Sequence, residues 1–150
     1  FSYGSQNRIS QLFTPKIDKV VFAATKADQI VATDHLSLVQ LLSSLVEQAY
    51  ENAEFEGVRP ETLAVAGVRS SIEVDFDGET GLSGFDTNGN AIGYVHPPIP
   101  KSIPKNTQDQ YFSDWKIPKF NPPVPPDESE AVPHIRMDNI LRILIGDKCS

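Results

Sequence analysis

The chain has 150 residues, of which 39% are hydrophobic and 22% charged, and its formal net charge is −7. This composition is typical of a soluble domain with one core, and the acidic balance disfavours sequence-independent binding of nucleic acid. Cys149 is the single cysteine, which excludes a disulfide framework and a cysteine metal cluster within these residues and favours a reducing, cytoplasmic setting.

The first predicted element is a helix over residues 6–13, where apolar residues recur at helical spacing ahead of Pro15. A βαβ unit follows. Residues 20–24 and 63–66 are short apolar runs typical of buried strands, and a helix is predicted between them, from residue 33 or 34 to 52, with Gly57 as a stop beyond it. Its apolar stripe consists of Leu38, Leu41, Leu42, Leu45 and Ala49. The two strands are expected to be parallel, with the helix over one face.

The tetrapeptide Thr25-Lys26-Ala27-Asp28 directly follows the first strand, where open α/β sheets bind ligands. An ionised carboxylate has two oxygens that accept hydrogen bonds and cannot donate them. Asp28 can therefore accept hydrogen bonds from the two adjacent donors of guanine, the ring N–H and the exocyclic amine. The stem of Lys26 can lie along the base, and the Thr25 hydroxyl can tie this loop to a neighbouring one. The tetrapeptide resembles the Asn/Thr-Lys-x-Asp motif of GTP-binding proteins. The alternative is that Asp28 merely caps the helix that follows.

Gly67-Val68-Arg69 follows the second strand and is expected at the same edge of the sheet. GTP-binding proteins have a Ser-Ala-Lys-like loop at that point, in which a backbone N–H meets the guanine oxygen and a long side chain flanks the ring. The main chain of Val68 and the side chain of Arg69 can fill these roles. All three residues differ from the family pattern, and an ordinary loop is the alternative for Arg69.

Residues 70–96 change to a period of two, alternating apolar and acidic side chains from Ile72 to Asp77. This pattern predicts an antiparallel ribbon, in which Asn88-Gly89 is the strongest turn signal. A calcium site on the acidic residues near Asp75 lacks the ligand spacing of an EF-hand, so a solvated acidic turn is favoured.

Ten of the twelve prolines lie in residues 97–133, which excludes regular helix or central strand there. We expect a connector that wraps over the surface, with an SH3-type ligand as the alternative. Four aromatic residues can anchor it to a core: Tyr111, Phe112, Trp115 and Phe120. A last amphipathic helix, within residues 134–150, is expected to return and pack on the sheet. Its stripe consists of Met137, Ile140, Leu141, Leu144 and Ile145.

The sequence contains no Gly-x-x-x-x-Gly-Lys-Ser/Thr loop, so groups that cradle phosphates and hold Mg²⁺ are not identifiable. In GTP-binding domains that loop precedes the Lys-x-Asp motif, and only 24 residues precede Thr25. The simplest account is the C-terminal portion of a longer protein, with no catalytic residue in this segment.

Several strings resemble the C-terminal part of the YcjX-like family, bacterial stress-associated proteins with a predicted P-loop nucleotidase fold. They are Ile17-Asp18-Lys19, Phe22 through Asp28, Ala53 through Gly57, Pro133 through Asp138 and Ile145 through Lys148. The resemblance implies that the phosphate loop and Mg²⁺ site belong to the missing N-terminal part, and that the whole protein binds GTP or GDP and hydrolyses GTP. It also implies a cytoplasmic protein peripheral to the inner membrane, with a membrane-associated stress protein as partner.

The predicted fold class is therefore α/β. Residues 1–69 form the guanine-reading βαβ part of a P-loop GTPase-like parallel sheet, 70–96 a β-ribbon insertion, 97–133 the Pro-rich connector and 134–150 the returning helix. The competing hypothesis is a non-catalytic protein-interaction module.

The histidines invite catalytic or metal-binding interpretations, which we do not favour. Arg136 is expected to pair with an acidic neighbour and His134 to support the turn after Pro133, rather than to act in phosphoryl transfer. His35 is expected to be exposed in the first turn of its helix, and His96 has no metal-like partner nearby in the sequence.

Overall fold

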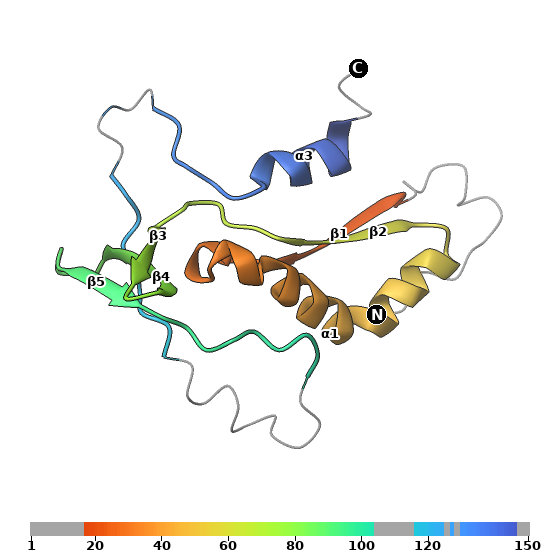
Figure 1. Ribbon diagram of the computed structural model, residues 1–150. Coiled ribbons are helices and arrows are strands. Elements are labelled where there is room, and N and C mark those ends of the chain that lie inside the picture. Colours follow the sequence, from red (N-terminus) through yellow and green to blue (C-terminus); the bar gives the residue numbers. More distant parts are fainter. Residues whose placement is uncertain (1–16, 104–115, 125–126, 128–129, 147–150) are drawn as a thin grey trace.

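The computed structural model describes residues 17–103, 116–124, 127 and 130–146. The helix predicted over residues 6–13 lies outside the described residues. The described elements form a two-stranded parallel sheet with a long helix, a three-stranded antiparallel sheet and a C-terminal helix (Figure 1). None of the described helices combines the length and the apolar character needed to cross a bilayer.

The predicted βαβ unit is present. Strands β1 (Lys19–Ala24) and β2 (Arg59–Ala64) pair in parallel register, and α1 (His35–Phe55) connects them and contacts both. The ring of Phe22 lies 6.5 Å from that of Tyr50, which places α1 against one face of the pair. Gly57 ends the helical region with φ of +75°, a conformation that glycine adopts without steric cost.

The boundaries of two predicted elements differ from those in the structure. The second strand was expected over residues 63–66, but β2 begins at Arg59 and includes Pro60. Proline within a run lowers the strand signal, although an edge strand tolerates it. The helix expected directly after Asp28 is the short 3₁₀ turn η2 (Ala27–Gln29), and a second 3₁₀ turn, η3 (Ala32–Asp34), leads into α1.

The predicted ribbon consists of β3 (Ser71–Phe76), β4 (Glu79–Phe85) and β5 (Ala91–Tyr94), which pair in antiparallel order. Asp77 and Gly78 make the tight two-residue turn, with φ of +54° and +94°, as right-twisted hairpins require. The turn predicted at Asn88-Gly89 is present, but within the longer loop of residues 86–90. In the part of the chain that the structure describes, no group of three or more His, Cys, Asp or Glu side chains could hold a metal ion.

Two small apolar clusters join the ribbon and the connector to the βαβ unit. One contains Ile30, Leu41 and Ile99, and the other contains Val31, Leu82 and Phe120. The prediction that Phe120 anchors the Pro-rich connector is therefore confirmed, whereas Tyr111, Phe112 and Trp115 lie outside the described residues. The described parts of that connector, residues 97–103, 116–124, 127 and 130–133, contain neither helix nor strand.

His96 fastens the end of the ribbon to the turns that precede α1. Its Nε2 accepts a hydrogen bond from the Val31 backbone N–H at 3.0 Å, and its Nδ1 donates to the Pro97 carbonyl at 2.8 Å. Only 8% of His96 is exposed. Because both ring nitrogens are engaged in this way, the imidazole acts as a structural bridge in the neutral form.

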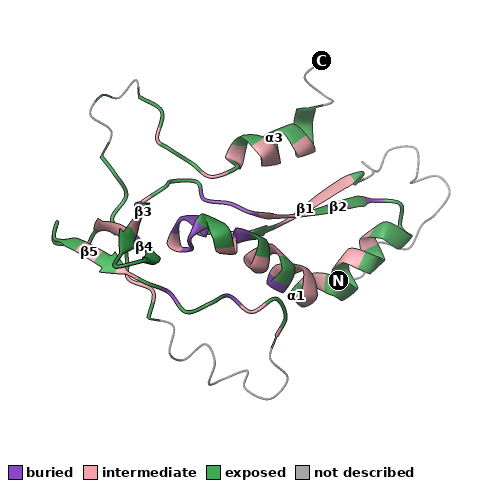
Figure 2. Cartoon of the chain, viewed as in Figure 1, coloured by how far each residue is buried: buried purple, intermediate pink, exposed green. Residues whose placement is uncertain are grey.

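The C-terminal helix α3 (Met137–Ile145) contacts β1, and Figure 1 shows it on the side of the β1–β2 pair opposite α1. The helix returns to the sheet as expected, but no described residue of α3 is buried, and Leu141, Leu144 and Ile145 remain 55%, 38% and 47% exposed (Figure 2). Two strands about 4.8 Å apart are narrower than a helix about 10 Å across, so the β1–β2 pair covers only part of one helix face. The apolar stripe of α3 is therefore left largely open among the described residues.

Candidate functional site

The loops that follow β1 and β2 lie side by side, joined by backbone hydrogen bonds. The N–H of Val65 donates to the Ala24 carbonyl at 2.9 Å, and the N–H of Ala27 donates to the Val65 carbonyl at 2.9 Å. Both loops leave the carboxyl ends of parallel strands, where ligands of open α/β sheets bind. The sequence-predicted residues after the two strands are thus brought to one edge of the sheet.

Asp28 lies in η2, directly beside the second loop. Asp28 is 6% exposed, and its Oδ2 accepts a hydrogen bond from the backbone N–H of Ser70 at 3.1 Å. The Ser71 hydroxyl donates to the Asp28 carbonyl oxygen. No side chain caps η2 or α1. The side chain of Asp28 therefore links the two loops and does not act as a helix cap.

The other predicted site residues are more exposed. Lys26 adopts φ of +60°, and both Thr25 and Lys26 project from the first loop into solvent. Gly67 and Val68 are exposed on the second loop. Arg69 is fixed at two points, because its N–H donates to the Pro133 carbonyl at 2.7 Å and its Nε donates to the Ser71 carbonyl at 3.2 Å.

A cavity of about 350 Å³ opens between the two loops, the ribbon and the segment before α3. Of the six predicted residues, Asp28 and Arg69 line it, and Thr25, Lys26, Gly67 and Val68 do not. The remaining lining consists of Ile30, Ala32, His35, Ser71, Glu73, Leu82, His134, Ile135 and Arg136. With two arginines and two carboxylates in its wall, the cavity offers both hydrogen-bond donors and acceptors to a polar ligand.

The segment that precedes α3 forms the third wall of the site. Ala66 and Ile135 exchange backbone hydrogen bonds of 3.0 and 2.8 Å as an isolated antiparallel bridge. Next to this bridge, Nη1 of Arg136 donates to the Ala64 carbonyl at 3.1 Å and to Nδ1 of His35 at 3.2 Å. Among the described residues, the contacts of the Arg136 side chain are therefore a carbonyl and an imidazole in place of the expected acidic neighbour.

His35 is buried, with 6% exposed, so the prediction of an exposed first-turn residue is also wrong. A guanidinium can only donate, so Nδ1 of His35 carries a lone pair and the proton is on Nε2. That Nε2 donates to the carbonyls of Ala27 and Ile30, at 2.9 and 3.1 Å. No local pattern in the sequence signals this pairing, because Arg136 and His35 lie 101 residues apart.

The amino-acid sequence of the chain is similar to that of a known protein family and of two named bacterial proteins. The model of the YcjX-like family (DUF463) matches residues 1–149. The chain belongs to this family. Proteins named "Ras-like GTPase YcjX" from Escherichia coli and Shewanella oneidensis are 36% and 28% identical to it over 153 and 160 residues. Each alignment covers 99% of this chain but 32% of the relative, so the chain spans about a third of the length of the curated relatives it matches.

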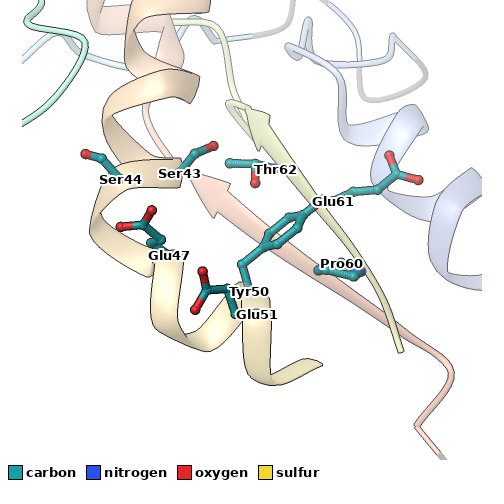
Figure 3. A pocket seen from close by; sticks show the side chains of 8 residues that line it. All are labelled: Ser43, Ser44, Glu47, Tyr50, Glu51, Pro60, Glu61 and Thr62. Atoms are coloured by element: carbon teal, nitrogen blue, oxygen red, sulfur yellow. The ribbon is translucent and has the colours of Figure 1, made fainter. Parts of the chain in front are cut away.

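A second cavity of this YcjX-like chain, of about 630 Å³, lies between α1 and β2 (Figure 3). Ser43, Ser44, Glu47, Tyr50, Glu51, Pro60, Glu61 and Thr62 line it, none of which the sequence singled out. Three glutamates and no basic side chain in the wall would repel a phosphate group. The candidate nucleotide site is accordingly the smaller cavity at Asp28.

Proposed function

We propose that this chain supplies the base-recognition loops of a guanine-nucleotide-binding protein, as part of a Ras-like GTPase of which it forms about a third. Membership of the YcjX-like family and the names of two relatives support the nucleotide class. The observation that carries the assignment to these loops is the placement of Asp28. Its carboxylate is held by Ser70 at the carboxyl ends of two parallel strands.

The chemistry of Asp28 fits guanine. An ionised carboxylate has about four lone-pair positions, so one hydrogen bond from Ser70 leaves acceptor capacity for both the ring N–H and the exocyclic amine. Adenine lacks this pair of adjacent donors. A carboxylate that is buried and already oriented also loses little conformational freedom when the base binds.

The neighbouring loop residues would complete the base site. We assign the stem of Lys26 to one face of the base, the hydroxyl of Thr25 to the junction of the loops, and the backbone N–H of Val68 to the guanine oxygen. Arg69 would flank the ring from the second loop, where it already lines the cavity with Asp28. The second loop is open beside Gly67, where an added Cβ would meet nothing within 4 Å.

The phosphate side of the nucleotide is assigned to the other two thirds of the protein. The present sequence has no Gly-x-x-x-x-Gly-Lys-Ser/Thr loop, and the described residues include no acidic cluster suited to Mg²⁺. The described residues therefore do not fit a magnesium site, and we derive no hydrolytic step from them. The chain alone is expected to lack GTPase activity.

We also propose that these other two thirds of the protein pack on the exposed surface formed by α3 and β1. Parallel sheets are normally larger and covered on both faces, whereas here α3 presents an exposed apolar stripe beside β1. Packing of the remaining chain on α3 and β1 would cover this surface. A role in stress response, a position at the inner membrane and a membrane-associated partner rest on the family resemblance.

The proposal is tested on the longer protein of which we propose that this chain forms about a third. Its melting temperature is measured in the presence of GDP, GTP or ATP. At a ligand concentration one hundred times Kd, a bound guanine nucleotide should stabilise the protein by about 2.7 kcal/mol. GDP and GTP should therefore raise the melting temperature, and ATP should not. Absence of any shift with GDP or GTP would contradict nucleotide binding.

A second candidate, a protein-interaction module, is favoured by the outer face of the ribbon. Ile72 and Phe85 are 62% and 59% exposed on this face, and Phe76 is 36% exposed. Exposed apolar side chains grouped on one surface are typical of interaction sites. The protein-interaction hypothesis would be favoured if guanine nucleotides do not change the melting temperature.

A further inference from the structure

We propose that Arg136, acting through His35, is a positioning residue that holds the turn carrying Asp28 in the form that reads the base. This inference rests on the proposed guanine site. It concerns how the C-terminal segment controls that site across 101 residues of sequence.

The two carbonyls that His35 binds lie on either side of Asp28. Nε2 donates to Ala27 and to Ile30, so a single proton is shared between the beginning of the turn and the residue that follows it. The turn itself has two backbone hydrogen bonds, from Gln29 to Lys26 at 3.0 Å and from Ile30 to Ala27 at 3.2 Å. A three-residue 3₁₀ turn has poor internal hydrogen-bond geometry, so external donors contribute to its shape, and His35 adds two contacts to the one from the Ser71 hydroxyl to the Asp28 carbonyl.

Arg136 determines which nitrogen of His35 can donate. Because the guanidinium donates to Nδ1, the proton must reside on Nε2, where it meets the two carbonyls. The same Nη1 donates to the Ala64 carbonyl at the end of β2. One nitrogen therefore joins the second strand to the turn that follows the first strand.

The backbone of Arg136 is itself held in an uncommon conformation. Its φ is +53°, in the left-handed region that a residue with a Cβ adopts at a cost. The bridge between Ile135 and Ala66 and the hydrogen bond from Ile140 to the Arg136 carbonyl fix this geometry on both sides. From this backbone position the side chain of Arg136 reaches Ala64 and His35.

The test uses the longer protein and the variants Arg136→Met, His35→Phe and the double variant. Methionine keeps the apolar stem of arginine without a donor, and phenylalanine keeps a ring without nitrogens. Each single variant should weaken GTP binding by about tenfold, which corresponds to about 1.4 kcal/mol. The double variant should be no weaker than the singles, because both changes break one relay.

Three further measurements separate positioning from a general loss of structure. Arg136→Lys keeps a nitrogen that can donate to both acceptors, so its GTP affinity should stay within about threefold of wild type. The backbone amides of Gln29 and Ile30 should exchange with solvent about tenfold faster in Arg136→Met. Arg142→Met, on the exposed side of α3, should change neither affinity nor exchange.

Additive losses in the double variant would show that Arg136 acts independently of His35 and would overturn the positioning role. Unchanged exchange of the turn amides, or unchanged GTP affinity of Arg136→Met, would overturn it as well. If wild-type protein shows no preference for GTP over ATP, the proposed function itself fails, and the positioning role fails with it. If Arg136→Met does not fold, His35→Phe and Arg136→Lys still decide the outcome: unaltered exchange in the first or a full loss of affinity in the second would contradict the relay.

Discussion

The carboxylate of Asp28 is bound to the backbone N–H of Ser70, which lies 42 residues further along the chain. The hydrogen bond crosses from the loop after β1 to the loop that leads into β3, so the two loops share one fixed acceptor. A main-chain donor leaves this arrangement independent of the side chain at position 70. Any ligand that binds Asp28 therefore meets a carboxylate whose direction is already set.

Exchange of this carboxylate for an amide should change the nucleotide preference of the longer protein. Asp28→Asn offers one donor and one acceptor, which match xanthine better than guanine, so preference should move from GTP toward XTP. Asp28→Ala should lose two charge-assisted hydrogen bonds of about 1.5–3 kcal/mol each and bind GTP far more weakly. Affinities for GTP, XTP and ATP measured by calorimetry give the ranking.

Asp75→Asn is the matched control for Asp28→Asn. Asp75 is an exposed carboxylate on the ribbon, bound to the Gly78 N–H, and is not part of the lining of the Asp28 cavity. Its exchange should leave the ranking unaltered. If Asp28→Asn also leaves the ranking unaltered, Asp28 does not read the base.

A methyl group at Gly84 should destabilise the contact between the ribbon and the connector. A Cβ at this position would lie 2.5 Å from Cδ1 of Phe120 and 2.8 Å from the Ser70 carbonyl. Gly84→Ala should therefore lower the free energy of unfolding by about 1–3 kcal/mol, as overpacking of a core does. Gly67→Ala, where a Cβ meets nothing within 4 Å, should change it by less than about 0.5 kcal/mol in the same urea titration. Equal effects would mean that Phe120 does not pack on Gly84.

A charge on α3 should matter more in the longer protein than in this chain alone. Leu141 is 55% exposed here, so Leu141→Asp should alter the melting temperature of the isolated chain very little. In the longer protein, where we propose that α3 is covered, the buried unpaired carboxylate should cost several kcal/mol. Arg142 lies in the same helix and is exposed, so Arg142→Ala should lower the melting temperature only slightly in both proteins. Tolerance of Leu141→Asp in both proteins would show that the rest of the protein does not pack on this stripe.

The carboxyl of Asp86 should titrate below its ordinary range. The backbone N–H of Asn90, then its side-chain amide, lowers the pKa of Asp86 from 3.8, and hydrogen bonding by Asn88 adds to this while burial opposes it. Because the pKa is lowered on folding, the stability this group gives to the loop is complete above pH 3.8 and is lost as the pH falls through the folded-state pKa. An NMR titration of the carboxyl group measures the pKa of Asp86. Asn90→Ala should raise this pKa only part of the way back to 3.8, since the backbone donors remain. A carboxyl titrating at 3.8 in the folded chain would contradict the loop geometry.

Periodicity allowed the regular elements to be predicted from the sequence. The apolar stripe around Leu41 and the alternation after Ile72 report a helix and a strand because each side chain's direction follows from its own element. The loops after β1 and β2 were likewise placed together correctly, since parallel strands bring their carboxyl ends to one edge.

The remaining features depend on contacts between distant segments. The burial of His35 requires Arg136 and the carbonyls of a turn, and neither lies at a recognisable spacing from it. An amphipathic stripe predicts that a helix has a partner, but it does not say whether that partner lies within the same 150 residues. For that reason the helix α3 and its return to the sheet were predicted correctly, whereas the exposure of its apolar stripe was not predicted.

The bridge between Ala66 and Ile135 also bears on when the site can form during synthesis. These residues are separated by the whole ribbon and the whole connector, and the closure of so long a loop must precede the gain from its contacts. On the ribosome, β1, α1 and β2 can assemble while residues near Ile135 are still inside the exit tunnel. The segment around Ile135 is therefore the last wall to be added to the cavity at Asp28, after translation of this region is complete.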